Sequence, residues 1–219
     1  MFDLDKTIYN DHSFFGIVKF LADEGVINVS TWEEVSAELG KYKGKVQTYS
    51  ETANKLLEIF ARSLSGKSEV DVREATAKFF DNNRGNFYSY FEKILPKLKK
   101  THEVWLVTTN IHIAAEVVVK MFELDGYIST QFEVVEGRFT GRILSTLANG
   151  KSVVEGLLTK YAGESLAFGD SENDIEMLSR VNTAVCVNPS AELRAEALKR
   201  DWVITTDGEA HMLECLDNG

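Results

Sequence analysis

The sequence predicts an α/β fold, a Rossmann-like parallel sheet with a block of helices inserted after its first strand. Two observations lead to this prediction. Residues 13–100 carry apolar side chains mostly at helical spacing. From residue 104 onward, short apolar runs alternate with helical segments, and such alternation is typical of a parallel sheet with helices on both faces.

The helical block is expected to contain a series of amphipathic helices. SFFGIVKFLADEG places its apolar residues at helical spacing and meets a stop signal at Gly25. STWEEVSAELG begins with a cap pattern at Ser30 or Thr31 and ends at Gly40. SETANKLLEIFARSLSG repeats this design, and further helices are expected in EVDVREATAKFFDNN and FYSYFEKILPKLKK. Pro96 is expected to bend or shorten the last of them.

The sheet is expected to begin with a strand over residues 1–4 and to continue in the second half of the chain. VWLVTTN, SLAFGD, TAVCVNP and WVIT are short apolar runs typical of buried parallel strands. Helices are expected in HIAAEVVVKMFEL, KSVVEGLLTKYAG, NDIEMLSRV, SAELRAEALKRD and DGEAHMLECL. QFEVVEGRFTGRIL is expected to form a hairpin that turns at Glu136 and Gly137.

The composition is that of a globular protein, with 219 residues of which 44% are hydrophobic and 26% charged. A formal net charge of −10 argues against partners such as nucleic acid or an anionic membrane surface. No apolar run reaches the roughly 20 residues that span a bilayer. Cys186 and Cys215 lack a metal-binding spacing and are interpreted as buried free thiols, and only two residues precede Asp3, too few for a signal peptide. We therefore expect a cytoplasmic protein.

Polar residues collect where the predicted strands end. The strand ends are followed in chain order by Asp3, Asp5 and Thr7, by Thr108, Thr109 and Asn110, and by Gly169, Asp170 and Asp174, while Lys151 begins a helix. A polar turn explains any one of these groups. Their meeting at one sheet edge is better explained by a binding site, because open parallel sheets bind ligands at the carboxyl ends of their strands.

These residues carry a resemblance to a known family. The pattern Asp-x-Asp-x-Thr at residues 3–7, the hydroxyl of Thr108 after an apolar strand, the isolated Lys151 and Gly-Asp-Ser-x-x-Asp at residues 169–174 resemble the four motifs of the haloacid dehalogenase superfamily. EGRFTGRI and VNPSAELRAEALKRDWVI are similar to stretches of its phosphoserine-phosphatase-like branch. The resemblance implies the fold of that superfamily for nearly the whole chain.

The resemblance also implies an enzyme, a phosphatase that hydrolyses a small phosphorylated metabolite with Mg²⁺ as cofactor. Asp3 would be the nucleophile that forms an aspartyl-phosphate, and Asp5 the acid and base. Thr108 would bind a phosphate oxygen and Lys151 would neutralise charge. The implied metal ligands are the Asp3 carboxylate, the Asp5 backbone carbonyl and Asp170, with Asp174 acting through water or beside them. The implied substrate contacts are Thr109, Asn110 and His12.

The inserted helices would form a cap of the C1 type over residues 12–90, and residues 1–11 and 91–219 the core. Six aromatic residues are candidates for the inner wall of the cap, although most of them are expected to pack in its core: Phe14, Phe15, Trp32, Tyr42, Tyr49 and Phe60. Three arginines are expected to face solvent, and one of them could contact a substrate carboxylate: Arg62, Arg73 and Arg84. His12 stands where phosphoserine phosphatases carry a glutamate that binds the substrate amine, which argues against phosphoserine.

Two alternatives to hydrolysis stay open at this stage. A phosphotransferase or mutase would pass the phosphoryl group from Asp3 to another hydroxyl. A non-catalytic binding protein would keep the fold without turnover, and the short first strand is the feature that favours it. The sequence is compatible with a monomer or a homodimer.

Overall fold

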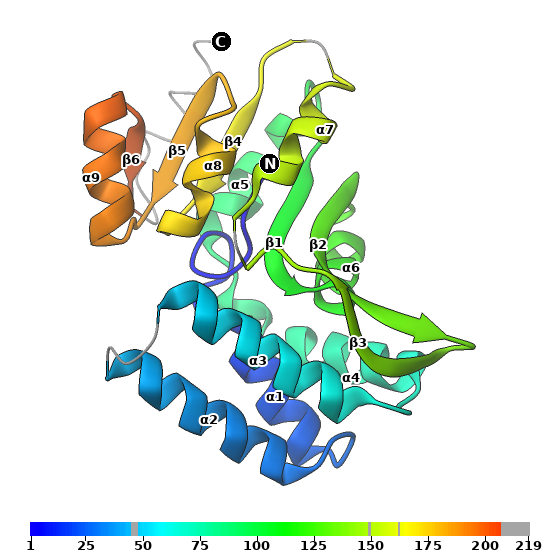
Figure 1. The fold of residues 1–219 in the computed structure, drawn as a ribbon. Coiled ribbons are helices and arrows are strands. Elements are labelled where there is room, and N and C mark those ends of the chain that lie inside the picture. Colours follow the sequence, from blue (N-terminus) through cyan, green and yellow to red (C-terminus); the bar gives the residue numbers. More distant parts are fainter. Residues whose placement is uncertain (45–47, 149, 162, 207–219) are drawn as a thin grey trace.

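The computed structural model describes residues 1–44, 48–148, 150–161 and 163–206. Its centre is a parallel sheet (Figure 1). On one side β1 (Trp105–Ile111) pairs with β2 (Gly126–Val135), and on the other β4 (Leu166–Gly169) pairs with β5 (Thr183–Val187), which pairs with β6 (Val203–Thr205). All of these pairings are parallel, as the alternating sequence predicts.

The amino-terminal residues lie between the two halves of the sheet and join them. The backbone N–H of Phe2 donates to Trp105 at 2.9 Å, and the N–H of Asp3 donates to the Phe168 carbonyl at 3.0 Å. Phe2 bridges β1 and β4 in parallel, so the predicted first strand exists only as this short paired segment. The ring of Phe2 stacks on Phe168 with 4.2 Å between centroids. Pairing on both sides therefore anchors Asp3 although the strand is short.

An antiparallel hairpin extends one edge of the sheet. β2 continues into β3 (Arg138–Ser145), and the turn residues Glu136 and Gly137 have φ angles of 50° and 72°. Two consecutive positive φ values are typical of the tight turns whose twist matches that of paired strands. The predicted hairpin and its turn are confirmed. Its tip reaches the helical block, where the N–H of Gly66 donates to the Phe139 carbonyl at 2.8 Å.

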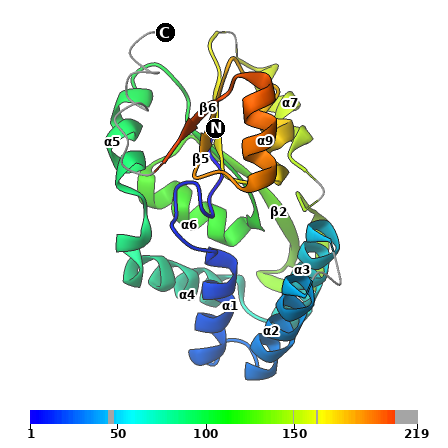
Figure 2. The same cartoon turned by 90° about the vertical axis from the view of Figure 1, so that its left-hand side faces the viewer.

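The helical block lies at one end of the molecule, below the sheet in Figures 1 and 2. It consists of α1 (Ser13–Asp23), α2 (Val29–Lys43), α3 (Tyr49–Leu64) and α4 (Glu69–Asn82). Each helix buries one apolar face, and the largest of the fully buried side chains include Phe60 and Phe80. Such amphipathic helices gain most of their stability from packing rather than from intrinsic propensity.

The ends of the block's helices differ slightly from the predicted ones. α2 begins after Asn28, whose side chain accepts the N–H of Ser30 at 2.9 Å, so Asn28 caps the helix instead of Ser30 or Thr31. The helix also continues past Gly40, because one glycine in a helix costs only about 1 kcal/mol. Thr48 and Glu51 form a reciprocal capping box at the start of α3.

The remaining helices flank the sheet. α5 (Ser89–Leu98) ends two residues after Pro96, and α6 (His112–Phe122) and α9 (Ala191–Arg200) cover the sheet as expected. The two helices predicted over residues 151–163 and 173–181 are much shorter. They consist of brief 3₁₀ turns followed by α7 (Glu155–Leu158) and α8 (Ile175–Leu178).

Local sequence explains why α7 is short. Gly156 inside α7 weakens helix propagation.

Cys186 is a buried free thiol, as predicted. Cys215 and the last predicted helix lie outside the described residues.

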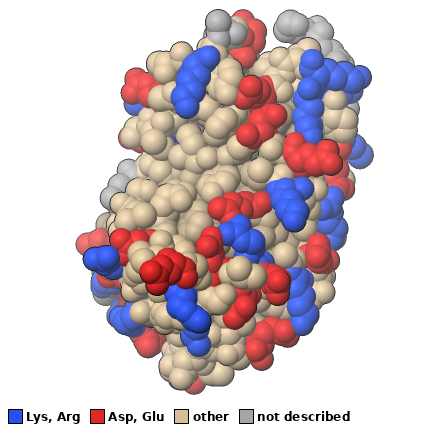
Figure 3. Space-filling model, turned by 90° about the vertical axis from the view of Figure 1, so that its right-hand side faces the viewer, with Lys and Arg blue, Asp and Glu red and all other residues tan. Residues whose placement is uncertain are grey.

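The surface and the described helices agree with the composition. Lys and Arg side chains lie next to Asp and Glu side chains on the face shown in Figure 3. Among the described residues, no helix is both long enough and apolar enough to cross a membrane.

The core is built from large apolar residues of both the helical block and the sheet, including Phe60 of α3 and Phe132 of β2, whose ring centroids are 6.1 Å apart.

Candidate active site

A buried lysine joins two of the predicted acids. The Nζ of Lys151 donates to Asp3 Oδ1 at 2.5 Å and to Asp174 Oδ1 at 2.6 Å. Lys151 is 1% exposed and Asp174 is fully buried. Asp3 follows the central paired segment, and Asp174 ends the short turn after β4. Residues separated by up to 171 positions in the sequence are thus brought together by the parallel sheet order.

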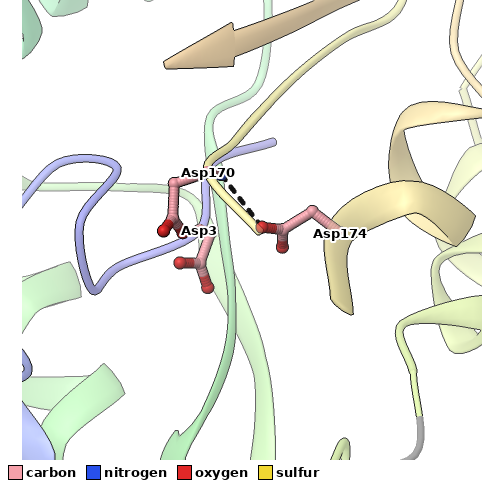
Figure 4. Close-up of side chains that lie close together, drawn as sticks. All are labelled: Asp3, Asp170 and Asp174. Atoms are coloured by element: carbon pink, nitrogen blue, oxygen red, sulfur yellow. Dashed lines mark hydrogen bonds between the residues drawn. The ribbon is translucent and has the colours of Figure 1, made fainter. Parts of the chain in front are cut away.

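The second oxygen of Asp174 organises the loop after β4. Asp174 Oδ2 accepts the backbone N–H groups of Asp170 and Ser171, each at 3.0 Å, and the Ser171 hydroxyl at 3.2 Å. Gly169 is required there, because a Cβ on it would lie 2.5 Å from the Cβ of Asp174. These contacts fix the loop so that the Asp170 side chain turns toward Asp3 (Figure 4).

Three carboxylates meet in this small space. One oxygen from each of Asp3, Asp170 and Asp174 lies within 4.8 Å of the others. Lys151 is the cation paired with them, so two negative charges are left over when all three acids are ionised. Carboxylate oxygens are the ligands that Mg²⁺ prefers. The donor set and its unbalanced charge therefore fit a bound divalent cation.

The pKa values reflect this crowding. Burial, together with the charges of neighbouring acids, raises the pKa of Asp3 to about 7 although Lys151 opposes the shift. Burial and the charges of Asp174 and Asp3 raise the pKa of Asp170 to about 9. For Lys151, burial alone lowers the pKa, but the charges of the two acids outweigh it and raise the pKa. A divalent cation would favour the ionised forms of the acids.

Asp5 stands apart from this cluster and belongs to a different hydrogen-bond chain. Asp5 Oδ1 accepts the backbone N–H of Ser13 at 2.9 Å and its hydroxyl at 2.5 Å. The Ser13 hydroxyl in turn accepts Asn110 Nδ2 at 2.9 Å. Burial raises the pKa of Asp5, and the hydrogen bonds from Ser13 oppose that shift. An acid with a raised pKa that is held in one orientation is suited to proton transfer.

Three threonines complete the core side of the site. Thr7 donates to Asp170 Oδ1 at 3.5 Å, and its carbonyl accepts the hydroxyl of Tyr90 at 2.6 Å. Thr108 is 2% exposed and accepts the N–H of Asn110 at 3.1 Å. Thr109 holds the end of β1 through its carbonyl, which accepts the Thr130 hydroxyl at 2.7 Å.

A cavity of about 580 Å³ opens beside Asp5, between the sheet and helices α1, α2 and α3. Its core end includes Asp5, Thr109 and Asn110. Asp11 and the exposed His12 stand at the entry to α1 and also line it. The predicted substrate contacts therefore share one cavity. The sequence did not indicate Ser13, although its place directly after His12 at the first turn of α1 was a signal that could have found it.

Comparison with known proteins agrees with this geometry. The family model of the haloacid dehalogenase-like hydrolases matches residues 1–179. The chain therefore belongs to the haloacid dehalogenase-like hydrolases. This membership confirms the resemblance that the four motifs indicated.

Several individual relatives are similar to the chain over part or most of its length. A putative hydrolase of Mycobacterium leprae is 37% identical over 108 residues, which are 47% of this chain and 36% of that protein. The match thus spans about a third of that relative. A histidinol-phosphatase of Neisseria meningitidis is 25% identical over 220 residues, covering 93% of this chain and 96% of that protein.

Solved structures show the same fold. A Bordetella pertussis protein with unknown function superposes with a TM-score of 0.77 at 24% identity, covering 93% of this chain and 96% of that chain. A phospho-aspartyl intermediate analogue of phosphoserine phosphatase superposes with a TM-score of 0.65 at 19% identity, covering 99% and 96%. These likenesses confirm the α/β fold with its parallel sheet.

Proposed function

We propose that this protein is a Mg²⁺-dependent phosphatase that hydrolyses a small phosphomonoester through an aspartyl-phosphate on Asp3. The observation that carries the proposal is that Asp3 and Asp5 lie close in sequence but have different hydrogen-bond partners. Asp3 lies against Lys151 at 2.5 Å, whereas Asp5 is held by Ser13 at the core end of the cavity. One acid is placed to attack and the other to exchange protons.

The proposed first step transfers the phosphoryl group to the protein. An Asp3 carboxylate oxygen forms a bond to phosphorus as the bond from phosphorus to the ester oxygen breaks. Asp5 in its protonated form, which burial favours by raising its pKa, gives its proton to the leaving alcohol. The Lys151 ammonium stays beside Asp3 and offsets negative charge on the transferring group.

The proposed second step releases phosphate. Asp5, now ionised, takes a proton from water, and the water oxygen bonds to phosphorus as the phosphorus–Asp3 bond breaks. Asp3 and the protonated Asp5 are restored. Asp3, Asp170 and the Asp5 carbonyl would hold a Mg²⁺ ion, which would supply positive charge near the phosphoryl oxygens. Because both oxygens of Asp174 are engaged by Lys151 and backbone N–H groups, we place Asp174 beside the ligands rather than among them.

The relatives support the proposed reaction class. The full-length similarity to a histidinol-phosphatase and the structural likeness to phosphoserine phosphatase both involve proteins named for hydrolysis of phosphomonoesters. We also propose that α1–α4 act as the cap over residues 12–90, since three of these helices line the cavity beside Asp5. A cap that covers the site would exclude bulk water before chemistry.

Phosphate release from p-nitrophenyl phosphate tests the function directly. We expect turnover with Mg²⁺, none with a chelator, and none in Asp3→Asn under either condition. Asp81→Asn provides a matched control, because Asp81 is an exposed aspartate of α4, and it should keep wild-type activity. Loss of activity in Asp3→Asn alone assigns the effect to the nucleophile. Absence of turnover by the wild-type protein on a broad ester panel, with Mg²⁺ bound, would contradict the proposal.

A further inference from the structure

The cavity beside Asp5 is lined largely by side chains of the helical block. Its volume of about 580 Å³ lies within the roughly 300–1,000 Å³ typical of sites that enclose a sizeable organic ligand. Phe14 and Phe15 of α1, Trp32 of α2, and Leu56 and Leu57 of α3 form much of the wall. The wall is therefore mainly apolar and rich in aromatic rings.

The aromatic side chains of the wall are set against one another. The rings of Phe14 and Phe15 meet edge to face with 5.5 Å between centroids, and the ring of His12 meets that of Phe15 at 5.9 Å. Phe14 also packs edge to face on Phe60, which is fully buried and does not line the cavity. Phe14, Phe15 and Trp32 remain half-buried because one side of each faces the cavity. A planar ring could pack against them.

Charges in the cavity disfavour a carboxylate on the substrate. Among the described residues that line it, Lys19 is the only lysine or arginine, and its Nζ is paired with Asp23 at 2.6 Å. Asp11 is an acid on the same wall, and its Oδ1 lies 3.9 Å from the Nζ of Lys6, which does not line the cavity. The three arginines considered from sequence do not line the cavity but pair with glutamates: Arg62 with Glu34, Arg73 with Glu69 and Glu116, and Arg84 with Glu92.

The position of Asp5 determines which part of the substrate enters this space. Asp5 would give its proton to the leaving oxygen, so the alcohol part of the ester must lie on its side of the phosphorus. The cavity begins at Asp5 and extends between α1, α2 and α3. We propose that the substrate is the phosphate ester of an alcohol bearing an aromatic or heteroaromatic group and no carboxylate. This inference rests on the phosphatase function proposed above.

A matched set of alkyl phosphates tests the inference. We would compare kcat/KM for 2-(1-naphthyl)ethyl phosphate, ethyl phosphate and O-phosphoserine in the presence of Mg²⁺. All three are esters of alkyl alcohols, so a preference reports on the cavity more than on the leaving group. We expect the naphthyl ester to be preferred by about tenfold or more, in line with selectivities of hydrophobic pockets. Preference for phosphoserine, or equal rates, would overturn the inference.

Substitution of the wall assigns the preference to the cavity. Trp32→Ala should lower kcat/KM for the naphthyl ester by about tenfold and leave ethyl phosphate nearly unchanged. Trp202→Ala is the matched control, since Trp202 is partly buried in a separate cluster and lies against Arg200. An equal loss for both esters in Trp32→Ala would show a merely structural role and contradict the inference.

Binding separates the two proposals if no ester is hydrolysed. The wild-type protein can be titrated calorimetrically with the naphthyl ester and with ethyl phosphate in the presence of Mg²⁺. If no ester is hydrolysed, tighter binding of the naphthyl ester that is lost in Trp32→Ala would support the preference for an aromatic group and contradict the phosphatase function. Turnover of every ester without preference would support the phosphatase function and contradict the preference for an aromatic group.

Discussion

Removing one acid from the site should make the metal-free protein more stable. Asp170 has an ordinary pKa of 3.8 that is raised to about 9 in the folded chain. At pH 7 the folded state therefore holds a proton that the unfolded state has released, so stability falls as pH rises from about 4 toward 9. Over the roughly 3 pH units between 3.8 and 7, the extra proton held by the folded state lowers the free energy of unfolding by about 4 kcal/mol. Because the Asp170 side chain keeps some solvent exposure, we reduce this value by about half, to ~2 kcal/mol.

The variant Asp170→Asn removes this cost and keeps the shape of the side chain. Asparagine can still accept the Thr7 hydroxyl that Asp170 accepts at 3.5 Å. Urea unfolding in a chelator should show Asp170→Asn more stable than wild type by about 2 kcal/mol at pH 7. The difference should be much smaller at pH 4, which is close to the ordinary Asp pKa of 3.8, so that Asp170 is partly protonated in the unfolded state as well. Added Mg²⁺ should stabilise wild type and not the variant.

Asp174→Asn makes the same chemical change four positions away and should have the opposite effect. Asp174 accepts Lys151 and two backbone N–H groups, so breaking this buried pair should cost about 3–5 kcal/mol. Equal destabilisation of Asp170→Asn and Asp174→Asn in the chelator at pH 7 would refute a stability cost from the Asp170 carboxyl. A gain in stability from Asp170→Asn that did not shrink at low pH would refute it as well.

Three further substitutions probe other parts of the site. Ser13→Ala should lower the free energy of unfolding by about 1 kcal/mol. Because Ser13 lowers the pKa of Asp5, this substitution should also move the alkaline limb of the kcat/KM–pH profile to higher pH. An unmoved profile would argue against this role of Ser13. Gly169→Ala should lower thermal stability by about 1–3 kcal/mol through overpacking against Asp174, which an unchanged Tm would contradict. Lys6 has a φ of 61°, so Lys6→Gly should raise stability by up to about 1 kcal/mol in urea unfolding, and a loss would count against backbone strain.

Comparison of the predicted and observed elements shows where local pattern is sufficient. The hairpin at Glu136 and Gly137 and the parallel strands were predictable, because turn residues and apolar runs depend on near neighbours in the chain. Helix length was less predictable over residues 151–163, where Gly156 weakens helix propagation and α7 covers only Glu155–Leu158. The roles of the predicted residues remain predictions that the experiments above address.

The sequence by itself determined the family and the placing of Asp3, Asp5 and Asp170 at strand ends, because each motif is a few residues long and follows a recognisable apolar run. Only the tertiary structure decided how Asp5 is held. Ser13 and Asn110 are 97 positions apart, and their hydrogen bond forms because α1 packs at the end of β1. The same packing of α1, α2 and α3 against the sheet made the apolar cavity, since which rings face a space and which fill the core depends on contacts distant in the chain.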